Sequence, residues 1–403
     1  MKITSQLNNV IKLFETNLAV NFKTNPGNGA NIVFPQGFSN KGWKSFVLVS
    51  DLISAQSLTV HQQLLNPNLS VGYADYNNIN YTPDNQIIYV TGKFLQYKIL
   101  EYFPKTANIK TASQISKRTP TRDFRSGTPR ADLPIDFCDI IIIDQVQLGS
   151  IESEIITSLW TYAFNNNVKI PKLLIINSSL GIYNINTATD YKVFPPIEGF
   201  KDEYTEYSIE YIGDKNNLIN SITDLSFNIH SNNDNKNILI FVPSSNYIDI
   251  LESSLKNKLS DNYLLIPLKY GTSDNLSNIY KDTSDTFGRK IIIVTSITLD
   301  LIPINNVGYV IDCMLEEKYL KTWSGGSRFT TTYISKETSD QRSQRINSND
   351  PNNICYRMCS QETYLSLNDK NTPEYLEVAL YPYLLDLIEY EITPQVIHNN
   401  QLN

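Results

Sequence analysis

The stretch Ile140-Ile141-Ile142-Ile143-Asp144, followed by Gln145-Val146-Gln147, decides the fold of this chain. Consecutive isoleucines bounded by polar residues are typical of a strand that is buried on both faces of a parallel sheet. A carboxylate at the end of such a strand can organise Mg²⁺ for phosphoryl transfer. Many strands end in Asp, however, so the neighbouring segments must decide what Asp144 does.

Strands of the same type recur on both sides of this stretch. Short apolar runs predict strands at 46–49, 87–90, 173–176, 238–242, 264–266, 291–294 and 307–311. Helices are predicted between them at 54–65, 151–164, 247–259 and 274–281. Strands that alternate with helices predict parallel sheets with right-handed crossovers. Because the pattern runs twice, we expect an α/β chain with two tandem domains.

Length and charge limit the class of protein. The 403 residues suffice for two or three domains, and 41% hydrophobic against 19% charged residues indicates a globular chain. A net charge of −7 argues against a generally basic coat protein for nucleic acid, although a local basic groove remains compatible with it. The cysteines show no zinc spacing, so we expect no metal site and a reducing compartment.

No transmembrane helix or signal peptide is expected, because no uncharged apolar run reaches about 18 residues and the N-terminus is polar. Asn is very common in the sequence and Ala is scarce, as in proteins of AT-rich genomes, because Asn, Ile, Lys and Tyr have AT-rich codons. This composition favours a viral, plasmid or protist origin. We therefore expect a cytoplasmic or virion location, in the host cytoplasm if the protein is viral, and no contact with a membrane.

The segment 104–136 interrupts the alternation of strands and helices. It is polar, too long for a routine connection, and basic. Its central cations are Lys117, Arg118, Arg122 and Arg125. A solvated loop and a contact with a nucleic-acid phosphate backbone both remain open for this segment.

The order of the remaining motifs resembles the two RecA-like domains of superfamily 2 helicases, most closely the DEAH/DExH group. The nucleotide loop of that family aligns with 24–35, its DEAH box with 144–147, its SAT motif with 177–179, and its last motifs with 294–304 and 341–348. A β-hairpin is expected at about 316–332. The resemblance covers about residues 20–365. It implies a first RecA-like domain at 1–195 with the basic insertion 104–136, a second at 196–365, and a short helical tail at 366–403.

The resemblance also shows which nucleotide-site residues are kept and which are changed. The kept residues are Gly27, Gly29, Asp144, Gln341 and Arg345. The changed residues are Ala30 for the family's Lys, Asn31 for the hydroxyl, Gln145 and Gln147 for the Glu and His of DEAH, and Ser348 for the final Arg. A phosphate loop needs that Lys and hydroxyl, and an amide such as Gln145 cannot accept a proton. We therefore expect no intact catalytic residue and no cofactor, with residual binding of ATP and Mg²⁺ as the alternative.

Three hydroxyl residues match positions at which members of the family contact the phosphate backbone of nucleic acid. They are Thr91, Ser244 and Thr295. Each could equally be an ordinary strand-end or turn residue. The family's Arg pair after the second strand is replaced by Leu52-Ile53, which cannot contact phosphate. The binding groove that the resemblance implies is therefore partly kept and partly lost.

The leading hypothesis is a helicase-fold protein that has lost NTP hydrolysis. It would act as a nucleic-acid-binding or scaffold component, for example of a virion or of a replication or transcription complex. RNA or DNA and protein subunits of a larger assembly are the expected partners. The alternatives are an active or weakly active NTP-dependent RNA/DNA helicase and a purely structural protein-interaction module.

Overall fold

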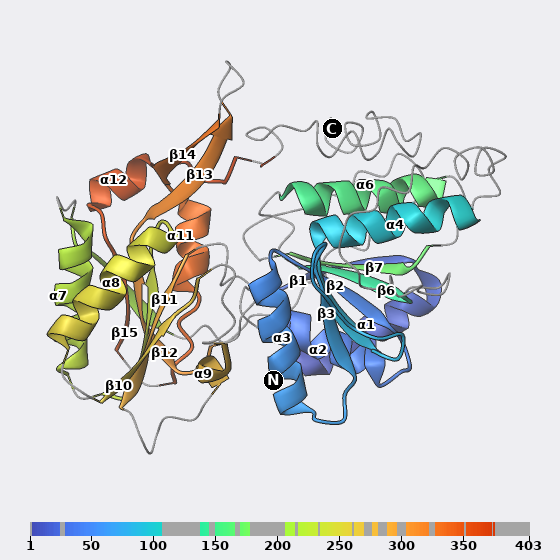
Figure 1. The fold of residues 1–403 in the computed structure, drawn as a ribbon, viewed down its shortest axis with the longest axis horizontal. Coiled ribbons are helices and arrows are strands. Elements are labelled where there is room, and N and C mark those ends of the chain that lie inside the picture. The colour runs from blue at the N-terminus through green and yellow to red at the C-terminus, as the bar shows by residue number, and fades with distance from the viewer. Residues whose placement is uncertain are drawn as a thin grey trace.

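A computed structural model describes residues 2–24, 29–106, 138–144, 150–165, 170–177, 206–213, 217–232, 234–259, 262–269, 276–280, 288–295, 304–321, 327–349, 352–372 and 374. These residues form two α/β domains that lie side by side (Figure 1). No helix within these ranges is long and apolar enough to cross a membrane.

The first domain is built on a sheet in which seven strands are described, in the order β1-β7-β6-β2-β5-β3-β4. The strands are β1 (Ala19–Lys23), β2 (Ser45–Val49), β3 (Val71–Ala74), β4 (Ile79–Asn80), β5 (Ile87–Thr91), β6 (Ile140–Asp144) and β7 (Lys172–Asn177). All neighbours pair in parallel except β3 and β4, which form an antiparallel edge. The central strands β2 and β5 are buried along their whole length, as continuous apolar runs predict.

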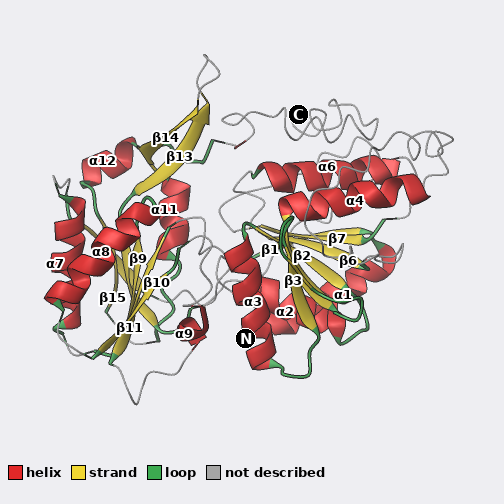
Figure 2. Ribbon diagram, viewed as in Figure 1, coloured by secondary structure: helices red, strands yellow, loops and turns green. Residues whose placement is uncertain are grey.

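Helices cover both faces of this sheet (Figure 2). On one face lie α1 (Lys2–Thr16), α2 (Ala30–Ser39) and α3 (Leu52–Leu65), and on the other lie α4 (Gly92–Thr106) and α6 (Ile151–Asn165). Successive side chains of a strand alternate between the faces. Phe46 of β2 accordingly packs in the α4/α6 core and Val47 in the α1–α3 core.

The second domain has a sheet with the described order β10-β11-β9-β12-β15-β8, in which every pair is parallel. Its strands are β8 (Tyr207–Tyr211), β9 (Asn237–Phe241), β10 (Tyr263–Pro267), β11 (Arg289–Val294), β12 (Val307–Asp312) and β15 (Asn353–Arg357). Helices α7 (Leu218–His230) and α8 (Ser245–Lys258) contribute to the apolar core on one face, and the short α9 (Leu276–Tyr280) contributes to the core on the other.

Three further elements complete the second domain. Strands β13 (Leu315–Lys321) and β14 (Ser327–Tyr333) form an antiparallel hairpin that projects from the sheet (Figure 1). Helix α11 (Lys336–Ser343) follows the hairpin, and α12 (Gln361–Ser366) follows β15. The hairpin confirms the expectation at about 316–332.

The two mostly parallel sheets, covered by helices, confirm the predicted fold class of tandem RecA-like domains. The helix predicted in the C-terminal tail lies outside the described residues. So does segment 104–136, apart from its first three residues, which end α4.

Candidate nucleotide and nucleic-acid sites

Three adjacent strands of the first sheet end at the same edge. In the register of the sheet, Lys23 of β1 lies opposite Asn177 of β7, and Asp144 of β6 lies opposite Ile176. The carboxyl ends of parallel strands are where α/β proteins bind ligands. The structure therefore brings Asp144 and the start of α2 to one edge, as the predicted nucleotide site requires.

Helix α2 begins directly after Gly29, which has a φ of 75° and adopts the left-handed conformation. The Gly29 carbonyl accepts hydrogen bonds from the backbone N–H of Ile32 and Val33, at 3.0 and 2.9 Å. Glycine is favoured here because a side chain at this φ is strained. A turn that favours glycine therefore precedes α2, at the position where the resemblance implies a phosphate loop.

The side chains at the start of α2 differ from those that bind a nucleoside triphosphate. Ala30 is 4% exposed and Asn31 is 5% exposed. The two positions offer backbone N–H groups, but neither an ammonium group for phosphate nor a hydroxyl for Mg²⁺. Residues 30 and 31 therefore do not fit Mg·ATP in the way that this class of site requires.

Buried polar side chains donate hydrogen bonds to two backbone carbonyls of α2. Pro35 lies inside the helix and has no N–H, so the carbonyl of Asn31 loses its usual donor four residues later. The Tyr89 hydroxyl donates to that carbonyl at 3.0 Å, and the Gln62 amide donates to the Ile32 carbonyl at 2.9 Å. Burial raises the pKa of Tyr89, so its hydroxyl stays protonated and remains a donor.

Replacing Tyr89 with Phe should lower the free energy of unfolding by about 1–3 kcal/mol, because the buried carbonyl of Asn31 loses its donor. Urea denaturation measures this change, and hydrogen exchange in α2 localises it. Tyr76→Phe is the matched control, since that tyrosine is 48% exposed. Equal stability of the two variants would contradict the role given to Tyr89.

The last of the aligned motifs, residues 341–348, begins in α11 and continues just beyond it, and its predicted site residues are buried. Gln341, Arg345 and Ser348 are 6%, 9% and 1% exposed. The Nε2 atom of Gln341 has no hydrogen-bond partner among the described residues. The same helix carries Arg342, which forms a buried ion pair with Asp312 at the end of β12. Arg342 thus holds α11 against the sheet.

The three predicted phosphate-backbone hydroxyls have different surroundings. Thr91 is buried at the end of β5, and its hydroxyl donates to the Asp75 carboxylate at 2.7 Å. Ser244 caps α8 without a side-chain capping bond, and half-buried Thr295 follows β11. Strands β9 and β11 are neighbours, so the structure brings Ser244 and Thr295 to one edge, whereas Thr91 lies on the other sheet.

The apolar residue Ile53, at a position where the resemblance implies an Arg, lies between the two domains. It is 1% exposed and belongs to the apolar cluster of the second domain, beside residues such as Ile279 and Ile304. Further along α3, the ring of His61 lies 4.6 Å from the ring of Tyr280, centroid to centroid. The surface of α3 that would face phosphate in the family therefore faces the second domain.

The burial of His61 against Tyr280 predicts that the stability of the protein depends on pH. Burial lowers the pKa of His61 from its ordinary value near 6.5, so the packed state favours the neutral ring. Its contribution to stability is complete above that ordinary value and is lost as the pH falls below it. Between about pH 7.5 and about pH 5.5, the wild type should lose more unfolding free energy in urea than His61→Phe does. Equal losses would exclude His61 as the titrating group.

Several predicted site residues lie outside the described residues. They are Gly27, Gln145, Gln147, Lys117, Arg118, Arg122 and Arg125. Within the described ranges, no group of three or more His, Cys, Asp or Glu side chains is arranged to hold a metal ion. Of the residues predicted for the nucleotide site in the first domain, the structure describes Gly29, Ala30, Asn31 and Asp144.

Sequence reasoning missed the residues that hold these edges in place. Tyr89 and Gln62 support α2, and Arg342 pairs with Asp312. Pro35 was the one available signal, because a proline inside a helix leaves a carbonyl that needs another donor. The other contacts join residues that are far apart in the chain, which no local pattern indicates.

Comparison with solved structures agrees with the fold. The chain superposes on the DEAH/RHA helicase HrpB of Escherichia coli with a TM-score of 0.77 and 16% identity, covering 96% of this chain and 46% of HrpB. A second structure of HrpB, described as a DExH-box NTPase, gives a TM-score of 0.69. The chain therefore has the tandem RecA-like helicase fold of HrpB.

Sequence comparison points to the same class over part of the chain. No protein-family model matches. A segment of 155 residues is 30% identical to the ATP-dependent DNA/RNA helicase DHX36 of Rattus norvegicus and of Homo sapiens, covering 37% of this chain and 15% of that protein. The Bos taurus protein is 28% identical over 184 residues. The chain thus has DEAH helicase homologues, and it spans less than half the length of each relative described here.

Proposed function

We propose that this chain binds single-stranded nucleic acid as a helicase-fold protein that does not hydrolyse NTP. The observation that carries the proposal is the start of α2, where the turn at Gly29 persists but Ala30 and Asn31 supply neither ammonium nor hydroxyl. The fold of HrpB and the segment shared with DHX36 support binding of nucleic acid. Such a protein would serve as a clamp or scaffold subunit, in the cytoplasm or in a virion.

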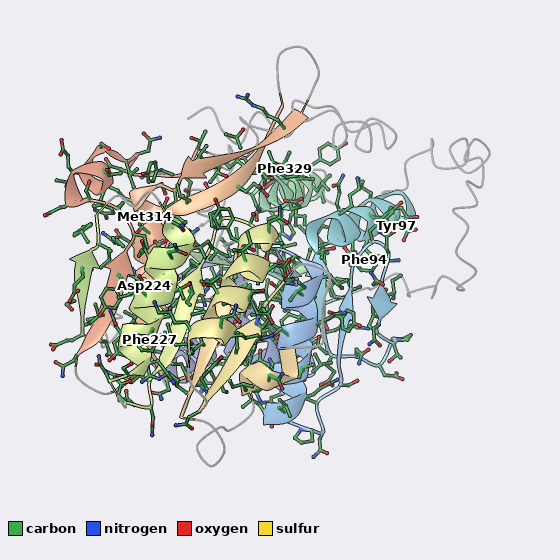
Figure 3. The ribbon with its side chains drawn as sticks, turned by 60° about the vertical axis from the view of Figure 1, so that its left-hand side comes forward. Phe94, Tyr97, Asp224, Phe227, Met314 and Phe329 are labelled. Atoms are coloured by element: carbon green, nitrogen blue, oxygen red, sulfur yellow. The ribbon has the colours of Figure 1, made fainter. Side chains whose placement is uncertain are left out.

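The hairpin of β13 and β14 offers the surface on which bases can stack. Phe329 is 67% exposed and Tyr333 is 48% exposed, and both lie on the same face of β14 because side chains alternate along a strand. Aromatic rings on an exposed strand are typical of single-strand binding surfaces, because every base has a π-face. Figure 3 shows Phe329 on the projecting hairpin.

Replacing Phe329 with Ala should weaken the binding of a fluorescent single-stranded oligonucleotide roughly 5- to 150-fold, because one stacked base contributes about 1–3 kcal/mol. Fluorescence anisotropy gives the dissociation constant. Phe227→Ala is the matched control, since Phe227 is a 38% exposed aromatic residue on α7, away from the hairpin (Figure 3). If both variants bind as tightly as the wild type, the hairpin is not the stacking surface.

The decisive experiment measures binding of the purified chain to single-stranded RNA and DNA at low and moderate salt, with and without Mg·ATP. Binding that weakens with salt but not with ATP is the expected result, because phosphate contacts release counterions. NTP turnover is measured in parallel, with Asp144→Ala as the control. Turnover above that control would overturn the loss of hydrolysis, and no binding under any condition would leave a scaffold role.

A further inference from the structure

A short strap fastens the C-terminal part of the described chain to α11. We define the strap as residues 368–372 and 374. The Asn368 carbonyl accepts from the backbone N–H of Lys336 at 2.9 Å, and the Asp369 carbonyl accepts from that of Glu337 at 3.1 Å. These N–H groups belong to the first turn of α11, where a helix has no internal partners for them. The strap therefore caps the helix that carries Gln341.

The same strap then reaches the first domain. Glu374 accepts a hydrogen bond from the backbone N–H of Ile151 at 3.0 Å, through its carboxylate Oε2. Ile151 is the first residue of α6, and a carboxylate is favourable at the N-terminal end of a helix dipole. The strap thus connects α11 in the second domain to α6, the next described helix after Asp144.

A second connection lies on the other helical face of the first sheet, where α3 meets α9. The Tyr280 hydroxyl lies 2.7 Å from the Ser57 hydroxyl and 3.3 Å from the Ser57 carbonyl. Ser57 is fully buried, and the His61 ring packs against the ring of Tyr280. One turn earlier on α3, Ile53 enters the apolar cluster of the second domain.

We propose that the strap and the α3–α9 contact together lock the two RecA-like domains in one relative arrangement that nucleotide does not change. Two attachments on opposite faces of the first sheet restrain both translation and rotation of one domain against the other. Hinge or shear closure around a ligand requires one domain to rotate or slide against the other, and both attachments oppose such a movement. The lock goes beyond the proposed function, since a chain could bind nucleic acid with mobile or with fixed domains.

The lock is tested by measuring one distance across the domains of the full chain. Spin labels are placed at Asn77→Cys and Asn257→Cys, which are exposed positions in the first and second domains. The native cysteines Cys138, Cys313, Cys355 and Cys359 are all buried. Burial also raises the pKa of Cys313 to about 12, so this thiol is a poor nucleophile. Pulsed electron paramagnetic resonance then gives the distribution of distances between the two labels.

The wild-type chain should give a single narrow distance that Mg·ATP leaves unchanged. Combining Ile53→Arg with Glu374→Ala should broaden it or add a second distance. Leu64→Arg with Glu362→Ala is the matched control, because both positions are exposed on α3 and α12. Glu374→Ala together with Tyr280→Phe tests the same lock without placing a charge in an apolar cluster, should the first pair fail to fold.

Two results would overturn the lock. One is a broad, multiple or ATP-dependent distance in the wild type, and the other is a distance in the folded double variants that equals that of the wild type. The measurement uses no nucleic acid. Failure of the lock is therefore distinguishable from failure of nucleic-acid binding, which anisotropy reports separately.

Discussion

Replacing Arg342 with Met should destabilise the second domain by about 3–5 kcal/mol, the effect of breaking a buried ion pair from one side. Arg342 is 4% exposed and its partner Asp312 is 0% exposed. Asp312 also accepts from the Ser339 hydroxyl at 3.1 Å and from the backbone N–H of Met314 at 2.9 Å. Those neutral donors remain in the variant, but they cannot balance a full negative charge away from water.

Urea denaturation followed by circular dichroism measures this loss. Lys336→Met is the matched control on the same helix, because its partner Asp369 is largely exposed and such pairs contribute little. Adding Asp312→Asn to Arg342→Met should recover part of the stability, since the amide carries no charge. A variant Arg342→Met as stable as Lys336→Met would show that the pair is not a main support of α11.

Replacing Ile53 with Ala should lower the free energy of unfolding by about 2–5 kcal/mol, the usual range for removing a buried isoleucine side chain. The size of the effect within that range depends on how far the surrounding cluster collapses into the space. Because Ile53 belongs to α3 but packs with the second domain, the variant should also uncouple the unfolding of the two domains.

The uncoupling is visible as two separate transitions in differential scanning calorimetry, where the wild type should show one. Leu64→Ala is the control on the same helix, since Leu64 is 60% exposed and its truncation leaves no cavity. If Ile53→Ala lowers stability no more than Leu64→Ala, the cluster tolerates the loss of Ile53 and the contact is weak.

Most of the central strands were predictable because they are buried on both faces and therefore read as unbroken apolar runs. The interior strand β15 was not predicted, because Asn353 and Arg357 at its two ends leave only a short apolar run. The run at 140–143 corresponds to β6, and the runs at 238–242 and 291–294 correspond to β9 and β11 within a residue or two. Strand β8 was not predicted, since its residues Ser208, Ile209 and Glu210 are exposed at the edge of the sheet and show no apolar run. A run of apolar residues in the sequence indicates a buried strand. Strand β8 lies at the edge of the sheet and is largely exposed, so it has no such run.

Motif order predicts that Gly29, Ala30, Asn31 and Asp144 share one edge of the first sheet, because it fixes which strand ends carry which residues. The register of β1, β7 and β6 places the ends of these three strands at one edge, and the role of that edge in binding nucleotide stays a prediction. The contacts between domains could not be predicted. Ser57 and Tyr280 are 223 positions apart, and no periodicity links them.

The position of Ile53 has a consequence for self-association. Ile53 and Ser57 of α3 contact the second domain through their side chains. Two chains that exchange their first domains would form these same contacts between molecules, as in a domain-swapped dimer. Because the monomer and such a dimer share the contacts of α3, protein concentration and the path of refolding would decide between them.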